Sequence, residues 1–126
     1  DPYANAFKAN PEDVPYHLDF PHQHPLVWER KYELDSLAAV LDFAHRLWRA
    51  TGRTTHLDQQ FRLALETIVK VIKTEQSHDR NSYRLHRPGG PIPDSLSHSG
   101  LGAPFANTGM SWSGFRPVMT HVSTHS

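Results

Sequence analysis

Two stretches of the sequence repeat apolar residues at the spacing of an α-helix. The first covers residues 36–51, where the apolar positions are Leu37, Val40, Leu41, Ala44, Leu47 and Trp48. This spacing places them on one face of a helix with 3.6 residues per turn. Asp35 or Ser36 can supply the side-chain oxygen that caps the start of this helix. Gly52 follows it and predicts its end.

The second helical stretch covers residues 57–76. Its apolar positions are Phe61, Ala64, Leu65, Ile68, Val69, Val71 and Ile72. Thr55 or Asp58 can cap its start, and Lys70 and Lys73 lie near its end, where cations suit the helix dipole. Residues 52–56 form a connection short enough to predict an antiparallel αα-hairpin.

The apolar surface of the second helix is wider than one partner helix can cover. Leu63, Val69 and Val71 extend the main stripe around the helix. The chain as a whole is 37% hydrophobic with a mean hydropathy of −0.59, which is low for an independent core. We therefore expect a bare apolar helix face, through which the chain can self-associate or recruit a partner.

The segments outside the hairpin carry turn residues rather than a regular period. Residues 1–27 contain prolines at positions 2, 11, 15, 21 and 25, and residues 88–91 read Pro-Gly-Gly-Pro. Residues 1–7 are either a buried turn or an N-terminal tail, and residues 83–87 are either a short strand or an extended arm. Residues 118–126 are expected to fray. The pattern predicts a mainly α chain made of one αα-hairpin and long loops.

Composition narrows the classes of partner. Thirteen basic and thirteen acidic residues give a formal net charge of zero, which argues against a nucleic-acid or polybasic membrane surface. No apolar run approaches the ~20 residues that span a bilayer. There is no cysteine, so thiolate metal sites are excluded and the compartment cannot be read. We expect no metal or other cofactor, and the sequence indicates no localisation. Because the first residue is Asp, we expect a piece of a longer or processed polypeptide.

Two segments combine aromatic rings with polar and charged groups. Residues 28–37 read Trp-Glu-Arg-Lys-Tyr-Glu-Leu-Asp-Ser-Leu and lead into the first helix, and residues 108–117 read Thr-Gly-Met-Ser-Trp-Ser-Gly-Phe-Arg-Pro. Aromatic faces can stack on sugars while carboxylates and guanidinium groups bind hydroxyls. Equally, Trp28, Trp112 and Phe115 can be core anchors and the charges a surface cluster. The residue types alone leave both interpretations open.

These two strings, together with residues 1–7, 47–52 and 75–78 in the same order, resemble glycoside hydrolase family 125. The resemblance covers residues 1–117, whereas residues 118–126 form an unrelated tail. It implies a fragment of an (α/α)6 barrel, the six-hairpin glycosidase architecture. It also implies a metal-independent, inverting exo-α-1,6-mannosidase activity acting on terminal α-mannosides, so an α-mannoside glycan is the expected partner.

The resemblance also implies which residues bind substrate. Glu29, Arg30 and Asp35 would hydrogen-bond or orient sugar groups near the pocket floor. Trp112 would stack against the sugar or close one wall, and Arg116 would anchor the loop that presents the general acid. For Asp35, a helix-capping role is an equally good interpretation.

The catalytic carboxylates of the family have no counterpart here. The family pattern continues Ser-Asp-Asp after the Arg-Pro pair, whereas this chain has Val118, Met119 and Thr120. The general base belongs to the family's C-terminal half, which this chain lacks. We therefore expect an inactive fragment, arising from truncation or an altered reading frame after Pro117. The alternatives are a non-catalytic carbohydrate-binding remnant and a small helical interaction protein.

Overall fold

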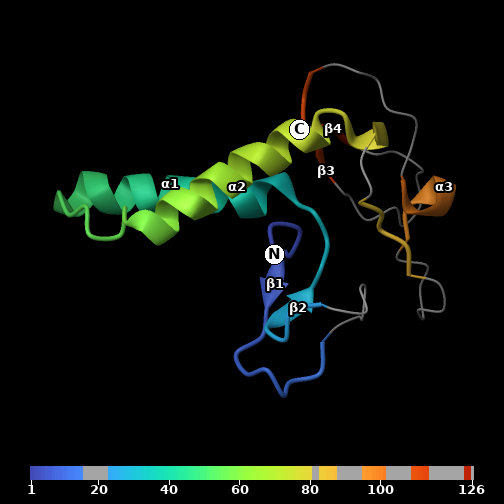
Figure 1. The fold of residues 1–126 in the computed structure, drawn as a ribbon, viewed down its shortest axis with the longest axis horizontal. Coiled ribbons are helices and arrows are strands. Elements are labelled where there is room, and N and C mark those ends of the chain that lie inside the picture. The colour runs from blue at the N-terminus through green and yellow to red at the C-terminus, as the bar shows by residue number, and fades with distance from the viewer. Residues whose placement is uncertain (16–22, 81–82, 88–94, 102–108, 114–123, 126) are drawn as a thin grey trace.

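The computed structural model describes residues 1–15, 23–80, 83–87, 95–101, 109–113 and 124–125. Two long antiparallel helices lie side by side, and the N-terminal segment projects from one end of the pair (Figure 1). The elements in chain order are β1 Ala6–Phe7, β2 Val27–Glu29, α1 Leu34–Thr51, α2 Gln59–Glu75, a single 3-10 turn η1 His78–Arg80, α3 Ser97–Gly100, β3 Trp112–Ser113 and β4 Thr124–His125. The described part of the chain is therefore mainly helical, and the predicted αα-hairpin is confirmed.

Helix α1 begins earlier than its apolar stripe indicated. Leu34 is its first residue, and extended Glu33 precedes it without a side-chain cap. The prediction that Asp35 or Ser36 caps α1 is therefore wrong. Asp35 lies instead inside the first turn, where its negative charge still suits the helix dipole. At the other end, Gly52 has a φ of 67° and its N–H donates to the Trp48 carbonyl, as predicted for a glycine stop.

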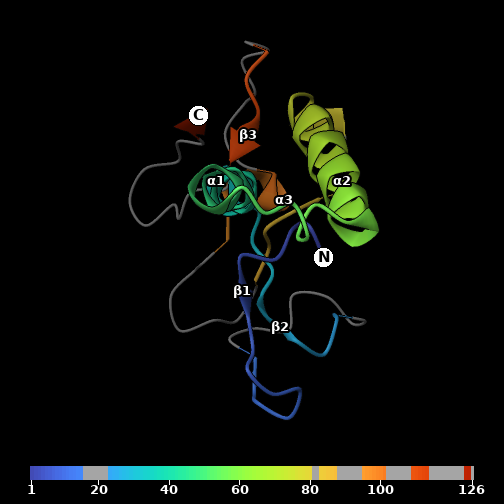
Figure 2. The same cartoon turned by 90° about the vertical axis from the view of Figure 1, so that its left-hand side faces the viewer.

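Helix α2 follows a loop that extends to Asp58. The Asp58 carboxylate accepts a hydrogen bond from the Phe61 N–H at 2.8 Å, so Asp58 rather than Thr55 is the cap. Lys73 lies in the last turn, as the helix dipole favours. Figure 2, a view along the helices, shows α1 and α2 adjacent, with β1 and β2 extending away from them.

Two short antiparallel sheets join distant parts of the chain. Strand β1 pairs with β2, so that Ala6 lies opposite Glu29. Residues 1–7 are thus an ordered turn and strand, not a loose tail. Strand β3 pairs with β4, with Trp112 opposite His125. Residues 124–125 are consequently paired, although the sequence predicted frayed ends there.

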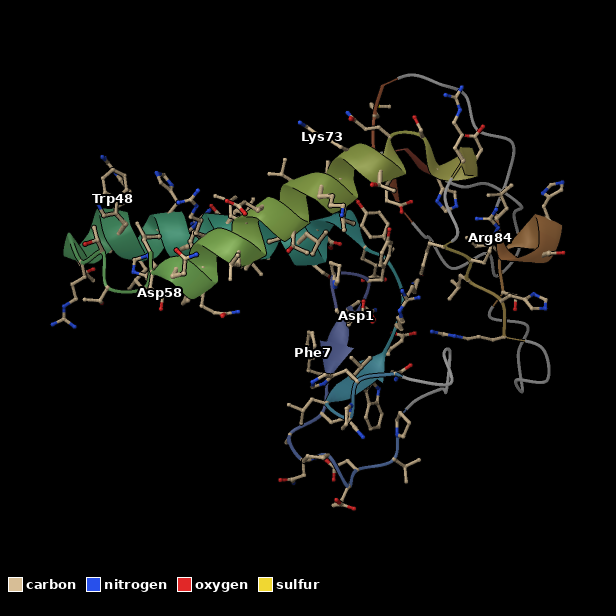
Figure 3. The ribbon with its side chains drawn as sticks, in the orientation of Figure 1. Asp1, Phe7, Trp48, Asp58, Lys73 and Arg84 are labelled. Atoms are coloured by element: carbon tan, nitrogen blue, oxygen red, sulfur yellow. The ribbon has the colours of Figure 1, made fainter. Side chains whose placement is uncertain are left out.

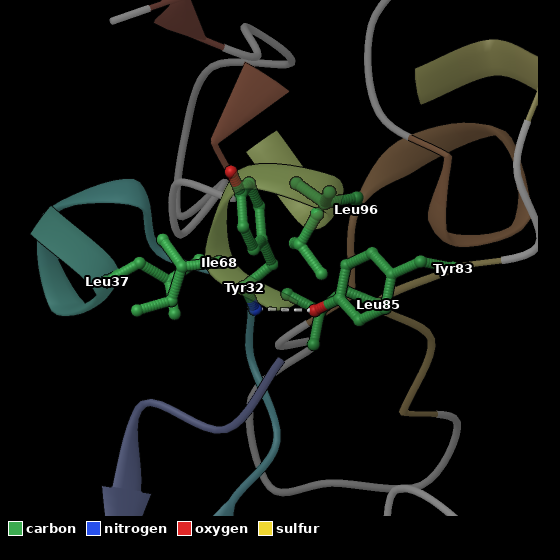
Figure 4. Close-up of a cluster of buried hydrophobic side chains, with 7 residues drawn as sticks. Tyr32, Leu37, Ile68, Tyr83, Leu85 and Leu96 are labelled. Atoms are coloured by element: carbon green, nitrogen blue, oxygen red, sulfur yellow. Dashed lines mark hydrogen bonds between the residues drawn. The ribbon is translucent and has the colours of Figure 1, made fainter. Parts of the chain in front are cut away.

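The hydrophobic core lies at one end of the hairpin and not along its whole length. Its buried side chains come from the segment before α1, the first turn of α1, the second half of α2 and the loops beyond: Tyr32, Leu37, Ile68, Val71, Tyr83, Leu85 and Leu96. Figure 4 shows this cluster, with the Tyr83 hydroxyl accepting a hydrogen bond from the Tyr32 N–H at 2.8 Å. The core therefore binds the loops to the base of the hairpin.

Residues 83–87 form an extended arm whose side chains alternate between buried and exposed positions, one of the two predicted structures. The Leu85 N–H donates to the Gly100 carbonyl, and the Leu96 N–H donates to the Leu85 carbonyl. Gly100 has a φ of 86°, and a Cβ there would lie 2.8 Å from the Leu85 backbone. A glycine is therefore needed where α3 meets the arm.

The rest of the hairpin leaves apolar side chains in solvent. On α2, where the bare apolar face was predicted, Leu63 is 47% and Val69 41% exposed. Phe43 is 70% exposed, and Trp48 projects outward from α1 in Figure 3. A hollow of about 420 Å³ lies between the N-terminal turn and the two helices, with Phe7, Val40 and Leu63 in its lining. No helix in the described ranges is both long and apolar enough to cross a membrane.

Candidate functional site

An arginine and two tyrosines meet where the N-terminal turn reaches the base of the hairpin. The Tyr3 and Tyr83 rings are stacked, with centroids 4.6 Å apart and planes 14° from parallel. The Arg30 guanidinium carbon lies 5.0 Å from the Tyr3 centroid and 5.4 Å from that of Tyr83. The Arg30 Nε also donates to an Asp1 carboxylate oxygen at 2.9 Å. Arg30 is thus oriented by a cation–π contact and an ion pair.

A buried polar network lies behind this stack, at the C-terminal end of α2. The Tyr3 hydroxyl donates to Glu75 Oε1 at 2.8 Å, while His78 Nδ1 lies 2.6 Å from Glu75 Oε2. His78 Nε2 lies 3.1 Å from the Leu101 carbonyl oxygen, which can only accept. His78 therefore bridges the Glu75 carboxyl group and the Leu101 carbonyl. The His78 and Glu75 side chains are fully buried, so the network holds the N-terminal turn, α2 and the loop after α3 together.

A second carboxylate, that of Glu29, connects three segments. Asn5 Nδ2 donates to Glu29 Oε2 at 2.9 Å, and the Arg87 guanidinium donates to Oε1 at 3.0 Å. Burial raises the pKa of the Glu29 carboxyl, but hydrogen bonds from Asn5 and Arg87 and the charges of Arg87 and Lys31 outweigh that effect. The net result is a Glu29 pKa below its ordinary value, so this group is an anion at neutral pH.

The tyrosine hydroxyls of the cluster stay neutral. Burial, together with the neighbouring Glu75 carboxylate, raises the pKa of Tyr3 far above its ordinary value. Burial also raises the pKa of Tyr32, despite the opposing effect of its 2.9 Å hydrogen bond with Ser111. These groups can therefore donate hydrogen bonds but are not available as bases at neutral pH.

The structure brings some of the sequence-predicted residues together and not others. Glu29 and Arg30 lie side by side at the end of β2, each with a partner from the N-terminal segment. Asp35 is exposed on α1, where its carboxylate accepts from the Ser36 N–H at 3.1 Å. Trp112 contributes backbone to β3, and its side chain lies outside the described part, as does all of Arg116.

The two polar and aromatic segments do meet at the same end of the hairpin. Ser111 is buried against the Tyr32 hydroxyl, and the Gln76 side-chain amide donates to the Gly109 carbonyl at 2.7 Å. These contacts bring the 109–113 segment to the entrance of α1. Trp28, in contrast, is 40% exposed, so the prediction of a core anchor at this position is wrong.

Sequence reasoning did not assign roles to several residues that build the cluster. They are Tyr3, Glu75, His78, Tyr83 and Arg87. In the sequence, Glu75 and His78 belong to the 75–78 segment that resembles the family, and Arg87 is one basic residue of a loop. A usable signal for Arg87 was the alternation over residues 83–87, which places Tyr83, Leu85 and Arg87 on the same side of an extended chain.

One of the two hollows borders the polar cluster, because Asp1 and Asn5 are part of its lining. The hollow beneath the hairpin is lined chiefly by apolar groups, and an open groove of about 650 Å³ follows Leu65, Val69 and Lys73 along α2. Within the described ranges, no three His, Asp or Glu side chains gather as metal ligands would. What the cluster presents is a half-buried polar surface with preset guanidinium and carboxylate groups.

Comparison with known proteins connects this surface to a family. The sequence profile described as metal-independent α-mannosidase (GH125) matches residues 1–121, four residues beyond Pro117. The chain belongs to glycoside hydrolase family 125. The match includes the N-terminal turn, both helices of the hairpin and the 109–113 segment, so the whole polar cluster is built from family 125 sequence.

Relatives of this family 125 chain are much longer than it is. A solved metal-independent α-mannosidase of Streptococcus pneumoniae, in a non-productive complex with α-1,6-mannobiose, is 38% identical and superposes with a TM-score of 0.84. That match covers 98% of this chain and 30% of the solved chain. The meiotically up-regulated gene 157 protein of Schizosaccharomyces pombe is 28% identical over 92% of this chain and 26% of its own length. The present fold is thus a fragment of the (α/α)6-type barrel of family 125.

Proposed function

We propose that this chain is the mannoside-recognition part of an exo-α-1,6-mannosidase and does not hydrolyse glycosides by itself. The observation that carries the proposal is the preset pair of Glu29 and Arg30. Each keeps part of its surface exposed while Asn5, Arg87 and Asp1 hold its polar atoms in place. Charged groups fixed in this way can hydrogen-bond sugar hydroxyls without first losing side-chain entropy.

The remaining binding groups are assigned by their place in the family 125 motif. Trp112 is proposed to stack on the sugar, and Arg116 to anchor the loop beside it. The Tyr32–Ser111 contact supports this assignment, because it holds the start of their segment beside Arg30. Asp35 is proposed to contribute from the exposed first turn of α1, at the rim of the same surface.

The absence of turnover follows from what an inverting hydrolase requires. One carboxylic acid must protonate the leaving oxygen, and a second carboxylate must activate a water molecule. The two carboxyl groups must lie about 6.5–9.5 Å apart to leave room for that water. Glu29 has a lowered pKa, opposite to that of a general acid. Glu75 is fully buried with both oxygens in hydrogen bonds, so it cannot reach a bound glycoside. Residues 118–120 carry no carboxylate.

The test uses the purified chain and α-1,6-mannobiose. We expect the disaccharide to shift amide resonances of residues 28–33 in NMR spectra, and maltose at the same concentration to leave them unchanged. Chromatography should detect no mannose above the no-protein blank. An Arg30→Gln variant should lose the shifts, whereas Arg53→Gln, an exposed arginine in the interhelical loop, should keep them. Mannose release would overturn the inactivity, and equal responses to maltose would overturn mannoside recognition.

Self-association is a second candidate function, favoured by the exposed apolar side chains of the hairpin. Val40 and Leu63 are exposed in the lining of the hollow beneath the helices, and Phe43, three residues after Val40 on α1, is 70% exposed. Two copies of the chain can each cover this surface on the other. Sedimentation velocity should then show a concentration-dependent dimer that Phe43→Ser weakens and mannobiose does not affect. A monomer at every concentration would exclude this candidate.

A further inference from the structure

Arg87 is the most deeply buried arginine or lysine in the described part of the polar cluster. Its side chain is 1% exposed, while that of its ion-pair partner Glu29 is 17% exposed. The two residues are 58 positions apart in sequence, and Arg87 comes from the extended arm of residues 83–87. An arginine buried to this degree must have its charge compensated, because desolvating an unpaired cation is costly.

Both oxygens of the Glu29 carboxylate are hydrogen-bonded, one to Arg87 and the other to Asn5. Arg87 binds Oε1 and Asn5 binds Oε2, so the Glu29 carboxylate cannot rotate without losing a hydrogen bond. The next residue in the chain is Arg30. The backbone at Glu29 is paired with β1, and Arg30 has separate partners in Asp1, Tyr3 and Tyr83.

We propose that Arg87 is a positioning residue, which holds the Glu29 carboxylate against Asn5 in the orientation that the mannoside-binding surface requires. This inference rests on the proposed function. Arg87 does not contact the sugar in this scheme, because its guanidinium group is buried behind Glu29. The proposed effect of Arg87 on binding passes through Glu29, which distinguishes Arg87 from a residue that touches the ligand.

The first experiment measures mannobiose affinity for four proteins: the unaltered chain, Arg87→Gln, Glu29→Gln and the double variant. We expect Arg87→Gln to weaken binding roughly tenfold, as changes behind a binding group commonly do. In the Glu29→Gln background, the same substitution should change affinity little, because its route of action has already been removed. Additive losses in the double variant would overturn the proposal.

The second experiment follows Glu29 directly, by the pH titration of its side-chain carbonyl carbon in ¹³C-labelled protein. Arg87→Gln removes a donor and a positive charge, so the titration midpoint of Glu29 should rise. Arg84→Gln is the matched control: it makes the same change three residues earlier, at an exposed side chain, and should leave the midpoint unchanged. A Glu29 midpoint unmoved by Arg87→Gln would contradict the positioning role.

Two further comparisons keep the outcomes separable. Arg87→Lys retains the charge but not the planar donor pair, so it should give an intermediate midpoint and affinity, and it serves where Arg87→Gln does not fold. Failure of the unaltered chain to bind mannobiose overturns the proposed function. A moved Glu29 midpoint in that case still shows that Arg87 holds the carboxylate.

Discussion

Replacing His78 by phenylalanine removes a hydrogen-bonding partner from a carboxylate that is fully buried. Glu75 accepts from the Tyr3 hydroxyl at 2.8 Å on one oxygen and faces His78 at 2.6 Å on the other. Phenylalanine keeps an aromatic ring at this position, although a larger one than imidazole, and the Nδ1 contact is lost. The same substitution also leaves the Leu101 carbonyl without the Nε2 donor.

The size of the effect follows from burial. Leaving a buried carboxyl group without one of its hydrogen-bond partners costs about 1–3 kcal/mol, and more where the group is charged. Both side chains are almost completely buried, at 1% and 0% exposure, so little solvent screening reduces this figure. Domains are stable by only about 5–15 kcal/mol, so the variant should lose a large part of its free energy of unfolding.

Urea unfolding followed by far-UV circular dichroism at pH 7 measures this loss. We expect the unfolding midpoint to fall steeply in His78→Phe with an unchanged dependence on urea concentration. His45→Phe, the same change at an exposed position on α1, is the control and should alter stability by less than about 0.5 kcal/mol. Tyr3→Phe removes the hydrogen bond to the other Glu75 oxygen and should cost about 1.5–3 kcal/mol.

The double variant of Tyr3 and His78 provides a further test. Tyr3→Phe and His78→Phe both act on the same carboxylate, so their combined cost should differ from the sum of the single costs. A His78→Phe variant that loses less than about 1 kcal/mol, or costs that add in the double variant, would refute the interpretation of a shared buried carboxylate.

Three other predictions test separate contacts. Because the pKa of Glu29 is lowered in the folded chain, its contribution to stability is present above the ordinary glutamate value of 4.5 and is lost as pH falls through the folded pKa. Glu29→Gln should therefore unfold at a lower urea concentration than the unaltered chain at pH 7. This difference in midpoint should shrink below pH 4.5, and a constant difference down to pH 3 would contradict the prediction. Asp58→Ala should cost about 1 kcal/mol through loss of the α2 cap, measured by thermal unfolding, whereas Asp42→Ala on the exposed face of α1 should cost less. Gly100→Ala should destabilise by about 1 kcal/mol or more, since alanine at its φ of 86° is strained and its Cβ would press on the arm; unchanged stability would mean that the arm can shift.

The sequence pattern was sufficient to predict the helices and their caps, because these elements are stabilised by interactions between residues close in sequence. The apolar repeat predicted both helices to within two residues at each end, and Gly52 and Asp58 act at the positions where their chemistry indicated. The start of α1 was misplaced because two polar residues, Asp35 and Ser36, separate Leu34 from Leu37, the first apolar residue of the stripe. A helix can include such residues when the segment before them is anchored elsewhere, as Tyr32 is in the core.

What the sequence by itself determined is the helical hairpin, its connection and the family strings that identify the chain. Only the tertiary structure decided which polar groups meet. Tyr3 reaches Glu75 across 72 positions, and Arg87 reaches Glu29 across 58. Neither pair follows any helical or strand period. Such pairs form because the core folds the N-terminal turn and the extended arm against the base of the hairpin. Burial then requires each charged group to find a partner.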